Sequence, residues 1–120
     1  EEQSGLRQTE AISSMLLGFA QKNRGMTRVL IGDALVTEDE ALQARINQIH
    51  DRIEAALKQS LRFAVTQKEV AEDIDLTAQA NLLMSFVAGR WHQYAKSGFR
   101  RDPAEHWQRQ WKQLMEGVLA

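Results

Sequence analysis

The chain contains no cysteine in its 120 residues. Disulfide bonds, thiolate zinc sites and cysteine nucleophiles are therefore excluded together. A single proline and the absence of any Gly/Ser-rich stretch argue against a flexible linker between two domains. No apolar run approaches the roughly 20 residues that span a bilayer, and the start lacks both an initiator methionine and a signal peptide. We expect a cytoplasmic protein with no membrane partner, present here as a fragment or processed form.

Net charge is also almost absent, because 15 Lys and Arg face 16 Asp and Glu. A surface that neutralises many DNA phosphates is usually strongly basic, so any basic site in this chain must be local. The 43% of hydrophobic residues and 26% of charged residues are ordinary for a globular protein. With this length, they predict one domain spanning residues 1–120.

Constellations that support catalysis or metal binding are missing. The chain has three histidines, His50, His92 and His106. None lies in an HExxH motif, and none lies three or four residues from another histidine, as zinc ligands on one helix would. Asp102 and His106 could share a helix face, but a capping role explains Asp102 better. Glu38 and Glu40 fit the first turn of a helix, where negative charge is favoured. Without a phosphate loop or nucleophile elbow, we expect no enzyme, no metal and no cofactor.

Turn and capping residues divide the chain into about five helices, which predicts an all-α bundle. The first runs from about residue 3 to 22 and ends at Asn23-Arg24-Gly25; a short one follows over 27–30. A Thr37-Glu38-Asp39-Glu40 capping box starts a long helix to about residue 64. Its apolar stripe comprises Leu42, Ile46, Ile49, Ile53, Ala56 and Ser60.

The last two helices have equally clear signals. An acidic connection over 68–75 ends in an Asp75 N-cap, so the fourth helix should run from residue 76 to about 96, buried on two sides. Gly98 is its expected C-terminal cap. Asp102-Pro103 then places a capping acid before a first-turn proline, which predicts that the last helix starts near Pro103.

These two helices carry more large apolar surface than a small monomer hides easily, which favours a homodimer. The residues expected at the dimer interface are Phe86, Gly89, Trp91, Trp107, Trp111 and Leu114. The alternative is that the tryptophans of the last helix complete the core of a monomer.

One face of the first helix is a candidate partner site. Met15, Gly18 and Lys22 are three and four residues apart, so they share that face, with a notch at Gly18 between an apolar side chain and a cation. Asn23 and Arg28 extend it toward the basic exit of the helix. An extended peptide with an apolar anchor and an acidic group would fit. Alternatively, Lys22 complements the helix C-terminus and Gly18 lets another helix cross closely.

The segment from Leu16 to Leu30, the following Gly32-Asp33-Ala34-Leu35, and residues 42–49 and 52–55 resemble the TetR family of transcriptional regulators, in its branch that acts in nucleoid occlusion. Weaker matches follow at Phe86, Gly89, Ser97, Phe99, Pro103 and Trp111. The resemblance implies a C-terminal helical domain that dimerises through its last two helices. It also implies a helix-turn-helix DNA-binding domain ahead of this chain.

In that branch the DNA-bound dimer engages the C-terminal tail of the tubulin-like division protein FtsZ. The resemblance assigns the tail site to the helix matched by Met15, Gly18, Lys22 and Asn23. The family usually has Arg in place of Lys22 and Pro in place of Arg24, which changes the donor geometry and the turn. The competing hypothesis is a conventional TetR-type sensor, with a small apolar effector lined by Phe19, Met84, Phe86 and Trp91.

Overall fold

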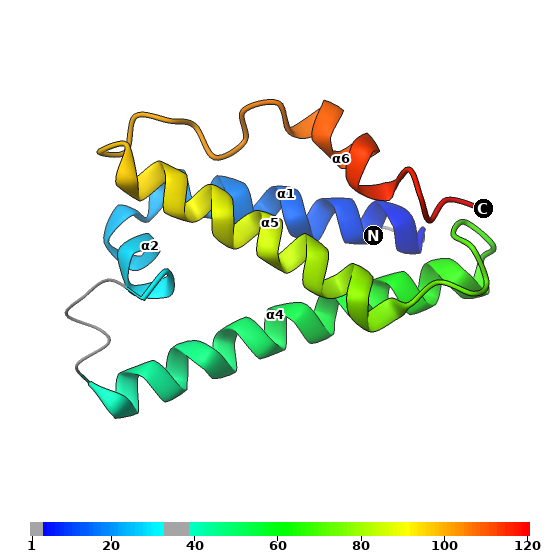
Figure 1. The fold of residues 1–120 in the computed structure, drawn as a ribbon, viewed down its shortest axis with the longest axis horizontal. Coiled ribbons are helices and arrows are strands. Elements are labelled where there is room, and N and C mark those ends of the chain that lie inside the picture. The colour runs from blue at the N-terminus through cyan, green and yellow to red at the C-terminus, as the bar shows by residue number, and fades with distance from the viewer. Residues whose placement is uncertain (1–3, 33–38) are drawn as a thin grey trace.

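The computed structural model describes residues 4–32 and 39–120, and these residues form an all-helical bundle (Figure 1). The helices are α1 (Gly5–Lys22), α2 (Arg24–Leu30), α4 (Glu40–Thr66), α5 (Leu76–Lys96) and α6 (Trp107–Met115). The predicted fold class is thereby confirmed. In Figure 1, α1 and α5 run side by side, α4 lies below them, and α6 lies on the opposite side from α4.

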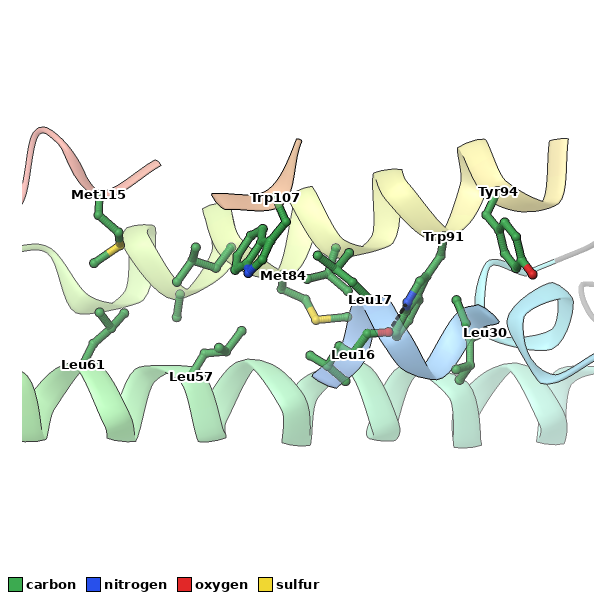
Figure 2. Packing of buried hydrophobic residues seen from close by; sticks show 14 of the residues in the cluster. Leu16, Leu17, Leu30, Leu57, Leu61, Met84, Trp91, Tyr94, Trp107 and Met115 are labelled. Atoms are coloured by element: carbon green, nitrogen blue, oxygen red, sulfur yellow. Dashed lines mark hydrogen bonds between the residues drawn. The ribbon is translucent and has the colours of Figure 1, made fainter. Parts of the chain in front are cut away.

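The core lies where α1, α4 and α5 meet, and α6 adds two side chains from the other side. Figure 2 shows Leu57 and Leu61 of α4 pointing toward α5, and Trp107 and Met115 pointing down from the C-terminal segment. Trp91 is the largest fully buried side chain, and its indole nitrogen donates a hydrogen bond of 2.9 Å to the Leu16 carbonyl oxygen. This bond joins α5 to α1 without leaving the indole N–H unsatisfied.

Small residues allow α1 and α4 to cross at close range. A β-carbon added at Gly5 would lie 2.7 Å from the Ala64 Cα and 2.7 Å from the Ser60 carbonyl oxygen. One turn further along, the hydroxyl oxygens of Thr9 and Ser60 are 2.7 Å apart in a buried hydrogen bond. Gly5 is therefore the glycine at which the two backbones require the absence of a side chain.

The connection between α4 and α5 caps the N-terminus of α1. The Gln67 side-chain oxygen accepts a 2.7 Å hydrogen bond from the Gly5 amide, and the Glu69 carboxylate accepts from the Leu6 amide at 3.1 Å. The Ser4 hydroxyl accepts from the Arg7 amide and donates to Glu69. Amide donors that a helix leaves open are thus satisfied by a segment far away in sequence.

Several predicted boundaries are confirmed. α5 begins after Asp75, whose carboxylate accepts a 3.0 Å hydrogen bond from the Ala78 amide, and it ends at Lys96 as expected. Gly98 follows with a φ of 71°, the left-handed conformation that glycine adopts without strain. α1 ends at Lys22 as expected. A single residue, Asn23, with a φ of −138°, separates it from α2.

Three boundary predictions are wrong. α2 begins at Arg24, so Arg24 and Gly25 are helical and form no loop. The N-cap of α4 is Asp39, whose carboxylate accepts from the Leu42 amide at 3.1 Å; Thr37 and Glu38 of the predicted capping box lie outside the described residues.

The third error concerns α6, which begins at Trp107, four residues after the predicted start near Pro103. His106 has a φ of 64°, and this left-handed residue separates α6 from the preceding turn. Asp102 caps that turn, since its carboxylate accepts from the Ala104 amide at 2.8 Å. The Asp-Pro signal was therefore real, but it starts a turn and not the helix.

Candidate partner-binding and dimerisation surfaces

The predicted face of α1 is open to solvent in the protomer. Met15 is 64% exposed, and Phe19, one turn later on the same side, is 36% exposed. A β-carbon at Gly18 would meet no atom within 4 Å, so no other described helix of the protomer crosses closely at this glycine. The notch between Met15 and the exposed Lys22 is thus real surface, and the packing explanation for Gly18 is wrong.

Phe19 belongs to this face, although the sequence suggested it as an apolar position of the first helix and as part of an effector pocket. It lies four residues after Met15 and three before Lys22, the spacing that places side chains on one side of a helix. The spacing alone was sufficient to include it. We call Met15, Gly18, Phe19 and Lys22 the α1 face.

Two arginines of α2 pack on the same aromatic ring. The guanidinium carbons of Arg24 and Arg28 lie 5.4 and 5.2 Å from the centroid of the Phe99 ring. Such cation–π contacts hold a guanidinium against the face of an aromatic ring. Asn23 is half-buried and its amide nitrogen donates to the Phe19 carbonyl oxygen at 2.9 Å, so it shapes the junction of α1 and α2.

The predicted dimer surface on α5 and α6 is divided between core and solvent. Trp107 is only 8% exposed and packs against Phe86, with ring centroids 5.8 Å apart. Trp111 and Leu114 are half-buried. Gly89 is exposed, and a β-carbon there would meet no atom within 4 Å. The tryptophans thus contribute to the protomer core, while an open surface remains beside them.

Trp91 has almost no surface to offer to an interface. It is 1% exposed, and its indole binds Leu16 inside the protomer. The helical periodicity of α5 explains the error, because Trp91 follows Met84 by seven residues and Phe86 lies on the other side of the helix. Leu82 of α5 is exposed instead, at 45%.

Arg90 is a residue that the sequence reasoning missed. Its side chain is 6% exposed, its Nη2 donates to the Gln110 side-chain oxygen, and its Nη1 lies 4.0 Å from a Glu105 carboxylate oxygen. Nη1 has no hydrogen-bond partner among the residues described. Burial lowers the pKa of Arg90, as does the charge of Arg101, while Glu105 and Asp102 oppose this shift.

The histidines lie apart from one another. The part of the chain that the structure describes has no cluster of three or more His, Asp or Glu residues suited to a metal ion. His50 is hydrogen bonded through Nε2 to the Leu30 carbonyl oxygen at 2.8 Å and contacts the edge of Trp91. His106 occupies the left-handed turn before α6. Across residues 4–32 and 39–120, no helix is long and apolar enough to cross a membrane.

The residues suggested for an apolar effector pocket are not brought together. Met84 and Trp91 are buried in the core, whereas Phe19 is exposed on α1. Phe86 lies on the opposite side of α5 from Met84, against Trp107. These four side chains therefore line no common cavity.

Comparison with known proteins identifies the family of the chain. Residues 3–118 match the SlmA-like family, described as a tetracyclin repressor-like C-terminal domain. The chain is 40% identical over 119 residues to the nucleoid occlusion factor SlmA of Idiomarina loihiensis, covering 99% of this chain and 60% of that protein. It is 37% identical to the factors of the same name in Shewanella loihica and a Marinomonas species, with the same coverage. The chain thus spans about 60% of the length of these relatives. It belongs to the SlmA-like family of tetracyclin repressor-like C-terminal domains.

Proposed function

We propose that this chain is the dimerisation and partner-binding domain of a nucleoid occlusion regulator. In this proposal a helix-turn-helix domain elsewhere in the protein binds DNA, which makes the protein cytoplasmic and nucleoid-associated. The domain itself binds the C-terminal tail of FtsZ and opposes assembly of the division ring. Support comes from the family and from relatives that are named nucleoid occlusion factors.

The observation that carries the partner-binding role is the open α1 face. Met15 and Phe19 offer apolar contact on either side of Gly18, and Lys22 supplies a cation one turn further. An extended peptide with an apolar side chain and a nearby carboxylate matches this order. Lys22 presents a point charge and lacks the planar fork of an arginine, so the acidic group is held with less directional preference.

Peptide titration tests this role in a full-length protein bound to DNA. We expect Gly18→Trp, which fills the notch, and Lys22→Glu, which reverses the charge, to weaken binding of a fluorescent FtsZ tail peptide at least about tenfold. Arg62→Glu makes the same charge change on an exposed part of α4 and serves as the matched control. Wild-type affinity in both α1 variants would show that the tail binds elsewhere or not at all.

The dimerisation role rests on the outer face of α5 and α6. Leu82 and Gly89 are exposed there, next to partly buried Phe86, Trp111 and Leu114. Leu82, Phe86 and Gly89 are spaced by four and three residues, so they form one stripe along α5. The open space at Gly89 would allow a second copy of α5 to approach closely. In the proposed interface Trp107 packs behind this face, and Trp91, which is buried in the protomer core, makes no contact with the second copy.

A further inference from the structure

The C-terminal end of α6 is held to the first turn of α5 by a buried side chain. Gln79 is 7% exposed, and its amide nitrogen donates to the Leu114 carbonyl oxygen at 3.0 Å. The same nitrogen lies 3.3 Å from the Met115 sulfur. Leu114 and Met115 are the last two residues of α6. One side chain of α5 therefore contacts α6 at the point where α6 ends.

The carbonyl group that Gln79 binds is one that α6 leaves open. The last four carbonyl oxygens of a helix have no amide partner inside the helix. The Val118 amide would be the helical partner of Leu114, but it donates to the Met115 carbonyl oxygen at 3.0 Å instead. Gln79 supplies the missing donor from another helix. Because a hydrogen bond weakens steeply with misalignment, this bond favours one position of α6 along α5.

The apolar contacts of α6 define its position less sharply. The helix has nine residues, a length at which an isolated helix is unstable in water, so contacts with the rest of the protomer must hold it. Its buried side chains are Trp107, the first residue, and Met115, the last. Burial of apolar surface has no preferred direction. These two anchors therefore permit small shifts of α6 that the Gln79 hydrogen bond opposes.

The position of α6 matters because α5 and α6 together build the proposed dimer surface. Side chains of both helices line one depression on it: Leu82, Phe86, Gln110, Gln113 and Leu114. Gln79, Leu82 and Phe86 are three and four residues apart, so Gln79 lies at the start of the stripe on α5. Leu114, whose carbonyl group Gln79 binds, belongs to this depression. A shift of Leu114 would change the shape that a second copy meets.

We infer that Gln79 is a positioning residue for self-association, an inference that rests on the proposed dimerisation role. Its amide holds α6 at the position where Leu114 lies beside Leu82 and Phe86. Its burial keeps Gln79 itself out of contact with the second copy. Without this donor, only a fraction of the molecules has the complete dimer surface, and the apparent dissociation constant of the dimer rises as that fraction falls.

Other attachments of the C-terminal segment do not depend on Gln79. Val70 and Leu119 form an antiparallel bridge, and the Ala71 amide donates to the Val118 carbonyl oxygen at 2.7 Å. Figure 1 shows the chain after α6 returning to the connection between α4 and α5. We therefore expect variants of Gln79 to fold, with α6 retained but less precisely placed.

Sedimentation equilibrium of the chain over a range of concentrations tests the inference. Gln79→Met keeps a similar side-chain length and removes the donor, so the dissociation constant of the dimer should rise at least about fivefold. Thr9→Val is the matched control, because it removes the buried hydroxyl contact between Thr9 and Ser60, at the crossing of α1 and α4. That variant loses one buried hydrogen bond as well, yet its dissociation constant should stay within about twofold of the wild type. Circular dichroism verifies that both variants fold.

Gln79→Glu supplies a second test through its pH dependence. Burial raises the pKa of such a carboxyl group, so at about pH 5 it is neutral and can donate to the Leu114 carbonyl oxygen. At about pH 8 the carboxylate has no proton to donate. Relative to the wild type at the same pH, the dissociation constant should be near normal at the acidic pH and raised at least about fivefold at the alkaline one.

The outcomes separate this inference from the proposed dimerisation role. A wild-type chain that stays monomeric would contradict both. A dimeric wild type with an unchanged dissociation constant in Gln79→Met, or with an equal weakening in Thr9→Val, would overturn the positioning role alone. If Gln79→Met unfolds, Gln79→Glu decides the question, and the same ratio to the wild type at both pH values would overturn the inference.

Discussion

Gly5→Ala is the substitution for which the structure gives the clearest magnitude. The new β-carbon would lie 2.7 Å from both the Ala64 Cα and the Ser60 carbonyl oxygen, and closer still to the Ala64 nitrogen. These are backbone atoms, so α1 and α4 would have to move apart. Overpacking a core costs about 1–3 kcal/mol, and the gain in helix propensity from glycine to alanine is at most about 1 kcal/mol. Because the added β-carbon meets backbone atoms, the cost lies at the upper end of that range, and we expect a net loss of about 2 kcal/mol in the free energy of unfolding.

Gly18→Ala is the matched control in the same helix, because its β-carbon meets no atom within 4 Å. It should gain up to about 1 kcal/mol from helix propensity alone. Urea unfolding followed by circular dichroism, at one protein concentration, measures both variants. A Gly5→Ala protein as stable as the wild type would refute the close crossing of α1 and α4. A destabilised Gly18→Ala protein would refute the openness of the α1 face.

Three further predictions follow from particular contacts. Trp91→Phe removes the indole N–H that binds the Leu16 carbonyl oxygen and leaves a small cavity. Urea unfolding should therefore show a loss of about 2–3 kcal/mol in the free energy of unfolding. A change below the error of the fit would contradict the buried position of Trp91. Asp75→Ala removes the α5 cap and should cost about 1 kcal/mol by the same assay, whereas Asp73→Ala, an exposed acid in the same connection, should be near neutral. Gly89→Leu adds a side chain where the protomer has open space, so monomer folding should be retained while analytical ultracentrifugation shows weaker self-association; an unchanged association constant would remove Gly89 from the interface.

Local signals predicted the helices whose ends are determined by their own residues. Asp75 caps α5 through its side chain, and Gly98 ends it in a left-handed conformation. Both are consequences of covalent geometry and short-range hydrogen bonding, which a sequence displays directly. The start of α6 could not be read in this way. His106 adopts a left-handed conformation where Trp107 packs on Phe86, and that contact is between different segments.

The stripe on α4 was predicted only in part. Ile46 and Ser60 are buried as expected, but Ala56 is exposed and Leu57 takes the core position. Leu42 and Ile49 are exposed, although Ile46 between them is buried; in Figure 1 the N-terminal end of α4 diverges from α1 and α5. Helical spacing gives the relative angles of side chains but not where a neighbouring helix departs.

The candidate sites were likewise predictable from sequence only in part. Spacing along α1 was sufficient to place Met15, Gly18 and Lys22 on one face, and the structure shows that face open. Arg90 escaped detection because a charged residue at a core position is unusual. The buried positions Leu83, Val87, Arg90 and Tyr94 follow helical periodicity, and this pattern would have indicated its burial.

Light scattering of the 120-residue chain, measured over a range of concentrations, tests most directly the claim that this is a dimerisation domain. We expect a particle of twice the 13.7 kDa chain mass, and a shift toward the monomer in Gly89→Leu at equal concentration. A wild-type chain that remains at the monomer mass at high concentration would contradict the interface assigned to α5 and α6.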